Sequence, residues 1–327
     1  MDVFYLTPAG VERHGVNGLA TLLARADGFV WVDIPECDDE AATVLADVFG
    51  FHPMAIAECR SRNHVPTVHG YADHLFVVTH VPALGGTGHV HLLELDQFVG
   101  ERYLVSVHGP INPTLPAEAA LVETAGVLRR LEAGRLVPRA PTALCYAVTN
   151  AIVRRQRALI DTIALKIADL EQRVMTSSLR NPEVLLEEMF LIRHELITVR
   201  TMAAQGYEVF ARAATLARFL PPEGKGQLGD LAEQYDRVRH VCDGEKEFLF
   251  GVIDLFQTRT TTKMTIAMER LAVLAAVTLP VTAIASIAGM NVIVNERTHI
   301  FQLLLLVSVM AMISTVLLRW TRKQGWW

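Results

Sequence analysis

The sequence has few cysteines and no strong excess of charge of either sign. Its four cysteines (Cys37, Cys59, Cys145 and Cys242) lie far apart and form no CxxC pair. This argues against a zinc knuckle or a disulfide framework and favours reduced thiols. The net charge of −5 argues against a nucleic-acid partner, because a phosphate-binding surface needs clustered Lys and Arg.

Targeting and enzyme motifs are lacking as well. The first ten residues have neither the basic region nor the apolar region of a signal peptide, so we expect the N-terminal part to stay in the cytoplasm. No GxSxG, HExxH, Walker A or GxGxxG motif is present, and we therefore expect neither an enzyme nor an organic cofactor. A transporter and a membrane-tethered signalling or scaffold protein are the remaining classes.

The chain does have two long uncharged apolar runs near its C-terminal end, at 271–288 and 300–318. Each is close to the roughly 20 residues that cross a ~30 Å hydrocarbon core. One such run is compatible with a buried core helix, but two in succession favour a membrane hairpin. The tail after the second run contains Arg319, Arg322 and Lys323 among tryptophans. Basic residues mark the cytoplasmic flank of a span, so we expect a multi-pass protein of the cytoplasmic membrane with both termini inside.

The rest of the chain predicts a mixed α/β part followed by a helical part. Expected strands are 3–7, 29–34, 75–81, 89–95 and 102–108, and expected helices are 18–26, 39–49 and 116–133. The fold class is therefore α+β, with a sheet covered by helices. Further helices are expected at 142–175, from Pro182 to about Phe219 and from about Gln227 onward.

These patterns divide the chain into seven expected parts. They are a cytoplasmic α/β domain (1–135), a helical hairpin (136–225), a stem helix (226–269), a first membrane helix (270–291), an outer loop (292–299), a second membrane helix (300–319) and a basic, aromatic tail (320–327). A helix that runs unbroken from Gln227 to Gly289 is on the order of 90 Å long and extends well beyond a bilayer.

One face of that helix carries a stripe at steps of mostly three and four residues. Its members are Asp254, Gln257, Thr261, Thr265, Met268, Ala275, Leu279, Thr282 and Ser286, with Leu271 or Ala272 filling the gap after Met268. The stripe is polar at its cytoplasmic end, apolar in the middle and hydroxyl-bearing beyond Pro280. The pattern is also compatible with ordinary solvated and core positions.

The tripeptide Gly289-Met290-Asn291 stands at the end of the first apolar run, before a short loop and the second run. In this place it resembles the signature of the CorA-type magnesium channels. Upstream, Met268, Leu271, Leu279-Pro280 and Thr282 are similar to the family's M-x-x-L…L-P-x-T pattern. The segment from Phe49 to Pro53 resembles its F-G-I-H-P segment. The resemblance covers nearly the whole chain.

The resemblance implies a funnel-shaped homopentamer with an α/β/α cytoplasmic domain, in which five first-span helices line a pore for Mg²⁺. The pore-lining residues would be Asp254, Gln257, Thr261, Thr265, Ala275, Thr282 and Ser286. Met268, Leu271 and Leu279 would form an apolar gate, and Gly289, Met290 and Asn291 the selectivity filter. Metal contacts would come from Asn291, Asp254 and Asp230, and Glu296 in the outer loop would attract cations.

Departures from the family pattern leave the transported ion open. Thr265 stands where the family commonly has Asn, and the segment 83–86, where a regulatory acid is expected, has no carboxylate. Mg²⁺ is expected, with Co²⁺ or Ni²⁺ possible. The ZntB branch shares the fold and moves Zn²⁺, which accepts imidazole ligands readily. Candidate zinc ligands are His64, His69, His74, His80, His89 and His91, with the last two expected on one strand face, although strand histidines are more often buried or solvated.

Overall fold

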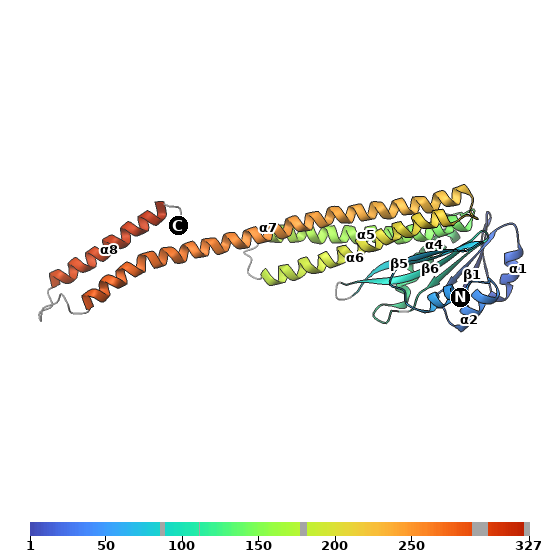
Figure 1. Cartoon of the computed structure of the whole chain (residues 1–327), viewed down its shortest axis with the longest axis horizontal. Helices are drawn as coiled ribbons and strands as arrows, with labels where there is room; N and C mark the ends of the chain where they lie inside the picture. The colour runs from blue at the N-terminus through green and yellow to red at the C-terminus, as the bar shows by residue number, and fades with distance from the viewer. Residues whose placement is uncertain (86–88, 111, 177–181, 290–299, 324–327) are drawn as a thin grey trace. The chain divides into compact units, whose positions relative to one another are not determined.

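The computed structural model describes residues 1–85, 89–110, 112–176, 182–289 and 300–323 (Figure 1). The chain divides into two compact units, Met1–Val252 and Ile253–Trp327. The first unit holds a sheet and the helices that cover it. The second unit holds the C-terminal part of one long helix and the last helix.

A seven-stranded mixed sheet forms the centre of the first unit. Its strands are β1 (Asp2–Thr7), β2 (Gly10–His14), β3 (Phe29–Ile34), β4 (Thr67–Gly70), β5 (His74–Leu84), β6 (Val90–Gly100) and β7 (Tyr103–His108). The spatial order is β2-β1-β3-β7-β6-β5-β4. Only β3 and β7 pair in parallel, and the other neighbours in this order are antiparallel.

Helices cover both faces of the sheet, which confirms the expected α/β/α sandwich. One face bears α1 (Leu19–Ala24), α2 (Asp39–Asp47) and α3 (Pro53–Arg60), and the other bears α4 (Val122–Glu132), α5 (Pro141–Thr176) and α6 (Pro182–Leu216). Two short 3-10 turns, η1 (Val16–Gly18) and η2 (Ala117–Ala119), precede α1 and α4.

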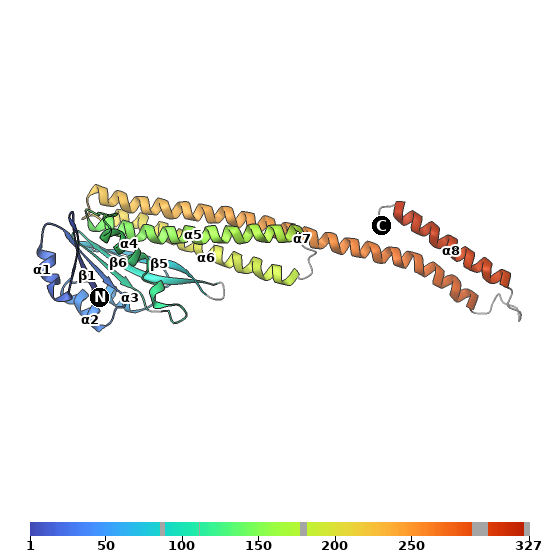
Figure 2. The same cartoon turned by 180° about the vertical axis from the view of Figure 1, so that it is seen from behind.

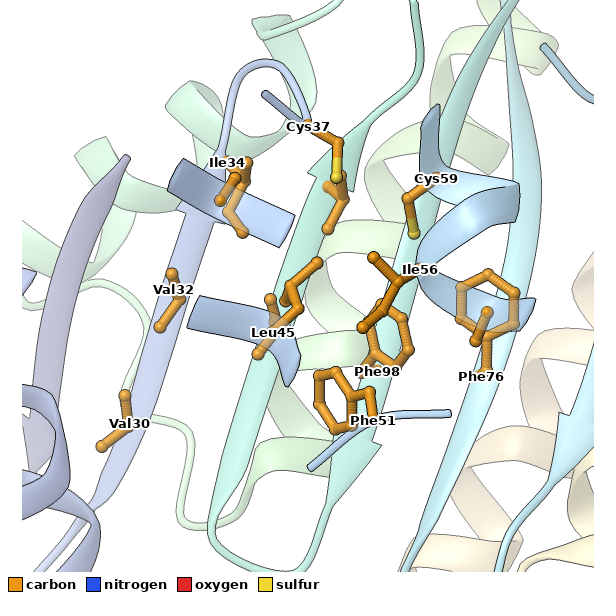
Figure 3. Packing of buried hydrophobic residues seen from close by; sticks show 14 of the residues in the cluster. Val30, Val32, Ile34, Cys37, Leu45, Phe51, Ile56, Cys59, Phe76 and Phe98 are labelled. Carbon is orange, nitrogen blue, oxygen red and sulfur yellow. The ribbon is translucent and has the colours of Figure 1, made fainter. Parts of the chain in front are cut away.

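The core beneath α1–α3 follows the alternation of the strands. Val30, Val32 and Ile34 of β3 belong to this core together with Leu45 of α2 (Figure 3). Trp31 lies between Val30 and Val32 in the strand, so its side chain points to the other face of the sheet. Its indole Nε1 donates a hydrogen bond to Ser106 Oγ at 3.0 Å. Burial of large apolar side chains on both faces explains why β3 reads as a continuous apolar run.

The segment from Phe49 to Pro53 links α2 to α3, and its residues have different structural roles. Gly50 adopts a left-handed conformation with φ of 67°. The N–H of Gly50 donates to Ala46 O and the N–H of Phe51 donates to Leu45 O. These two hydrogen bonds terminate α2. Phe51 stacks on Phe98 at 4.0 Å between ring centres (Figure 3). His52 caps α3 through Nδ1, and Pro53 occupies its first turn.

Beyond the sheet, α5, α6 and the first part of α7 (Pro222–Gly289) run side by side (Figures 1 and 2). Gly206 of α6 allows a close approach, because a Cβ there would lie 2.6 Å from the ring of Tyr235. Phe210 stacks on that ring with 5.7 Å between centres. The last helix is α8 (Ile300–Lys323), and both α7 and α8 are long and apolar enough to cross a membrane.

Several expected boundaries differ from the structure. The sequence patterns missed β2, β4 and α3, and β5 and β6 extend beyond the expected strands. The long helix begins at Pro222 rather than near Gln227, because proline at the first helical position starts a helix instead of prolonging the break. The expected division into seven parts stays a prediction.

Candidate ion-pathway residues

The predicted stripe on α7 lies on a helix surface that the chain itself leaves exposed. Its exposed members are Asp254, Gln257, Thr261, Thr265, Met268, Leu271, Ala275, Leu279, Thr282 and Ser286. The three apolar members expected to form a gate are each more than half exposed, at 53% for Met268, 65% for Leu271 and 67% for Leu279. In water such exposure of apolar side chains is unfavourable, so this surface needs a lipid or protein partner.

The side of α7 opposite the stripe is the less exposed one. Residues with reduced exposure in the apolar part are Val273, Ala276, Val277, Pro280, Val281 and Ile284. At about 100° of rotation per residue, this set and the stripe lie on opposite sides of the helix. In the apolar part the stripe therefore lies on the more exposed side of α7, whereas residues 260–268 are exposed all around the helix.

Hydroxyl groups of the stripe donate their protons to the helix backbone. Thr265 Oγ1 donates to Thr261 O at 3.0 Å, and Thr282 Oγ1 donates to Thr278 O at 2.8 Å. A carbonyl oxygen only accepts, so each hydroxyl oxygen is left with free lone pairs. These oxygens can accept hydrogen bonds from water, including the water that surrounds a cation.

Gly289 is the one residue of the expected filter that the structure describes. It is exposed at the end of α7, and a Cβ added there would meet nothing within 4 Å among the described residues. Packing within one chain therefore does not explain the glycine. Met290 and Asn291, and Glu296 of the expected outer loop, lie outside the described residues.

Asp230, expected near a regulatory metal site, is held by partners from its own chain. Its Oδ2 accepts hydrogen bonds from Tyr146 Oη at 2.6 Å and from Gln234 Nε2 at 2.7 Å. These bonds, that from Tyr146 first, lower the pKa of the Asp230 carboxyl. Asp230 is therefore a carboxylate at neutral pH, and its hydrogen bond with Tyr146 connects α7 to α5. Asp254, the other acid of the expected metal set, is exposed and belongs to the second unit.

Comparison with known proteins decides the family. Residues 26–323 match the family described as CorA-like Mg²⁺ transporter protein. The chain belongs to this CorA-like family. It is therefore a CorA-like transporter of divalent metal ions, and its family consists of membrane proteins rather than enzymes.

Named relatives agree with the CorA-like assignment. YfjQ of Bacillus subtilis (strain 168), a proposed metal ion transporter, is 23% identical over 302 residues, which cover 90% of this chain and 89% of YfjQ. The cobalt/magnesium transport protein CorA of Thermotoga maritima is 21% identical over 291 residues, covering 86% of this chain and 78% of that protein.

Solved structures of similar proteins share the CorA-like fold. The CorA magnesium transporter of Methanocaldococcus jannaschii aligns with a TM-score of 0.80 at 16% identity, covering 100% of this chain and 99% of that one. The ZntB cytoplasmic domain of Vibrio parahaemolyticus aligns with a TM-score of 0.61 at 10% identity, covering 80% of this chain and 98% of the domain. At these identities the likeness establishes the fold alone.

The histidines expected as zinc ligands in this CorA-like chain are dispersed. His74 is buried and stacks on Tyr71, and His80 Nε2 contacts Asn63 O at 2.8 Å. His89 precedes β6 instead of sharing a strand face with His91. Among the described residues no group of three or more His, Cys, Asp or Glu side chains could hold a metal ion.

A buried polar cluster in the sheet has the residue types of a hydrolytic triad but not its geometry. Asp33 Oδ1 accepts a hydrogen bond from Ser106 Oγ and lies 3.1 Å from His108 Nε2. In a triad the histidine lies between the nucleophile and the acid. Here the serine bonds directly to the acid, and both Ser106 and His108 are fully buried. The cluster links β3, β7 and α4, where Thr124 Oγ1 contacts His108 Nε2 at 3.3 Å. His108 Nδ1 has no hydrogen-bond partner among the described residues.

Proposed function

We propose that five copies of the chain form a channel in the cytoplasmic membrane, with both termini in the cytoplasm, and that it conducts Mg²⁺. The stripe of α7 faces the central pathway in each copy. The observation that carries the proposal is the exposure of all ten described stripe residues on one side of α7, a face that leads directly to Gly289.

The chemistry of the stripe suits an ion that keeps its water. Mg²⁺ is small, demands octahedral oxygen ligands and loses water reluctantly. Thr265 and Thr282 present hydroxyl lone pairs, since their protons are bound to backbone carbonyls. Hydrated Mg²⁺ can pass such oxygens through its water shell. Asn291 supplies a neutral amide oxygen that binds the shell without holding the ion too tightly to leave.

Apolar members of the same face act as the gate. Met268, Leu271 and Leu279 stand on the stripe with more than half of each side chain exposed. Rings of such side chains from several copies can close a pore by excluding water. Asp254 forms an acidic ring near the cytoplasmic mouth, and Glu296 raises the local cation concentration at the outer mouth.

The name of one relative favours Mg²⁺ with Co²⁺ as a further ion. A relative named as a cobalt/magnesium transport protein covers most of the chain. Zn²⁺ transport is the alternative within the fold, since the ZntB cytoplasmic domain aligns over 80% of the chain. The dispersed histidines of the sheet do not add support for zinc as the transported ion.

The filter assignment is tested by ²⁸Mg²⁺ uptake into proteoliposomes that contain the full chain. We expect Asn291→Ala to change the uptake rate by at least about tenfold, because the residue contacts the ion's water shell. Asn295→Ala is the matched control, since it removes the same side chain four residues farther on and should keep near-normal uptake. Equal uptake by the wild type and both variants would contradict the filter assignment.

A further inference from the structure

Two histidine rings from distant parts of the chain meet on the surface of the first unit. His89 lies immediately before β6, and His194 lies in α6. Their ring centres are 5.9 Å apart and their planes are at 84°. Both side chains are exposed.

Both histidines lie on hydrogen-bonded backbone. The carbonyl of His89 accepts the N–H of Gly85 at 2.8 Å, next to the paired residues Leu84 and Val90 at the end of the β5–β6 ladder. His194 lies in the middle of α6, where the following residue, Glu195, is buried and binds Lys166 Nζ at 2.8 Å. Because the backbone of each histidine is already ordered, the two side chains lose little conformational entropy when they bind one ligand.

The separation of the two rings fits one shared metal ion. Imidazole nitrogen binds Zn²⁺ at about 2.0–2.1 Å, which places two ring centres on one ion about 5 to 6.5 Å apart. The observed 5.9 Å lies in this range. Because both rings are exposed, water can complete the coordination of the ion.

The chemical surroundings favour a transition metal over Mg²⁺. Imidazole suits Zn²⁺, Ni²⁺, Co²⁺ and Cu²⁺, whereas Mg²⁺ prefers oxygen ligands. The neighbours of His194 one turn away on α6 are Phe190, Leu191, Ile197 and Thr198, and they offer it no ion pair. Among the described residues, no third His, Cys, Asp or Glu side chain joins the pair in a metal-holding group.

We propose that His89 and His194 form a two-histidine site for a transition-metal ion such as Zn²⁺ or Ni²⁺. The bound ion links the end of the β5–β6 hairpin to α6. The two histidines belong to the first unit, whereas the α7 stripe belongs to the second. The first unit can therefore bind a transition metal independently of Mg²⁺ transport.

The test is the thermal unfolding of the untagged full chain in detergent, with and without Zn²⁺, Ni²⁺ or Mg²⁺ at equal concentration. Binding to the folded state raises the melting temperature. We expect Zn²⁺ and Ni²⁺ to raise it more than Mg²⁺ does. His89→Ala and His194→Ala should each weaken the apparent affinity for Zn²⁺ at least about tenfold, because one remaining imidazole binds poorly. His64→Ala, which removes another exposed histidine of the same unit, should bind Zn²⁺ as the wild type does.

The double variant His89→Ala/His194→Ala gives a sharper criterion. If the two rings share one ion, the double variant should lose no more affinity than either single variant. Without metal, all variants should melt as the wild type does, since both side chains are exposed. Wild-type Zn²⁺ affinity in either single variant, or independent losses that add in the double variant, would overturn the proposal. Mg²⁺ uptake by the same variants reports separately on the transport function.

Discussion

Polar residues of the sheet differ in how well their groups are satisfied. Asp33 contacts both Ser106 and His108, whereas neither carboxylate oxygen of Asp96 has a hydrogen-bond partner among the described residues. Asp96 is fully buried on β6. Burial first, and then the negative charge of Glu94, raise the pKa of the Asp96 carboxyl well above its ordinary value. The protonated form is therefore favoured over a wide range of pH.

Asp96→Asn should stabilise the chain at pH 7 to 8. The folded state holds a proton that the unfolded state releases at the ordinary pKa of aspartate, so this group's contribution to stability falls as pH rises through the raised pKa. The amide of asparagine does not titrate in this way. Replacing the buried acid should therefore raise the free energy of unfolding by about 1 kcal/mol or more. Thermal unfolding of the full chain between pH 6 and 8 measures the effect.

Asp33→Asn is the matched control for that experiment. It changes an acid of the same sheet whose Oδ1 already has Ser106 and His108 as partners. A neutral amide oxygen at that position would accept these hydrogen bonds more weakly than the carboxylate does. This variant should lower the melting temperature. A lower melting temperature for Asp96→Asn at pH 8 would contradict the proposed state of Asp96.

Glu296→Lys should lower Mg²⁺ uptake when the external ion concentration is low. An acidic ring at the outer mouth concentrates cations, and a basic ring repels them. At high Mg²⁺ concentration or high ionic strength the difference should shrink, because salt screens exposed charges. Uptake measured across external Mg²⁺ concentrations checks this, and a curve unchanged from the wild type would remove the role of Glu296.

The segment Phe49–Pro53 shows how far residue identities alone could lead. Its residues resemble a pattern of the CorA family, and Pro53 is typical of a helix start. The positive φ of Gly50 and the stacking of Phe51 on Phe98 depend on how α2 and β6 pack, so they were not predictable from the segment. The effect of the Glu94 charge on Asp96 had a visible signal, two acids two residues apart in an apolar strand.

Among the elements, the long helix α7 carries the sharpest functional prediction. Leu279 lies on the stripe and Leu274 lies about 140° away around the helix. The two leucines are similarly exposed, at 67% and 61%. Leu279→Ser should increase Mg²⁺ flux severalfold, because a polar ring admits water to the constriction. Leu274→Ser should leave the flux near the wild-type value, and equal effects of both changes would contradict the gate.

Elements with strong periodicity were predictable, and short elements were not. The helices α5, α6 and α7 and the strand β3 follow clear apolar patterns, so their expected and observed ranges agree closely. The strands β2 and β4 are short, lie at the two edges of the sheet and bury few side chains. Their sequences therefore lack a strong pattern, since their place depends on pairing with β1 and β5.

At the scale of the whole molecule, the proposed pathway requires several copies of the chain. One α7 helix presents a stripe, but a pore needs such stripes on all sides. The resemblance to CorA channels implies five copies. We therefore expect native mass spectrometry of the detergent-solubilised protein to give five times the mass of one chain, and a monomer or dimer as the main species would contradict the proposed assembly.

The most direct test of the proposed function is ion flux into proteoliposomes that contain the purified full chain. Mg²⁺, Co²⁺, Ni²⁺ and Zn²⁺ are compared at equal concentration, with protein-free liposomes as the control. We predict Mg²⁺ flux well above that of the control. Zn²⁺ flux without Mg²⁺ flux would contradict the magnesium assignment, and no flux of any ion from a folded oligomer would contradict the channel itself.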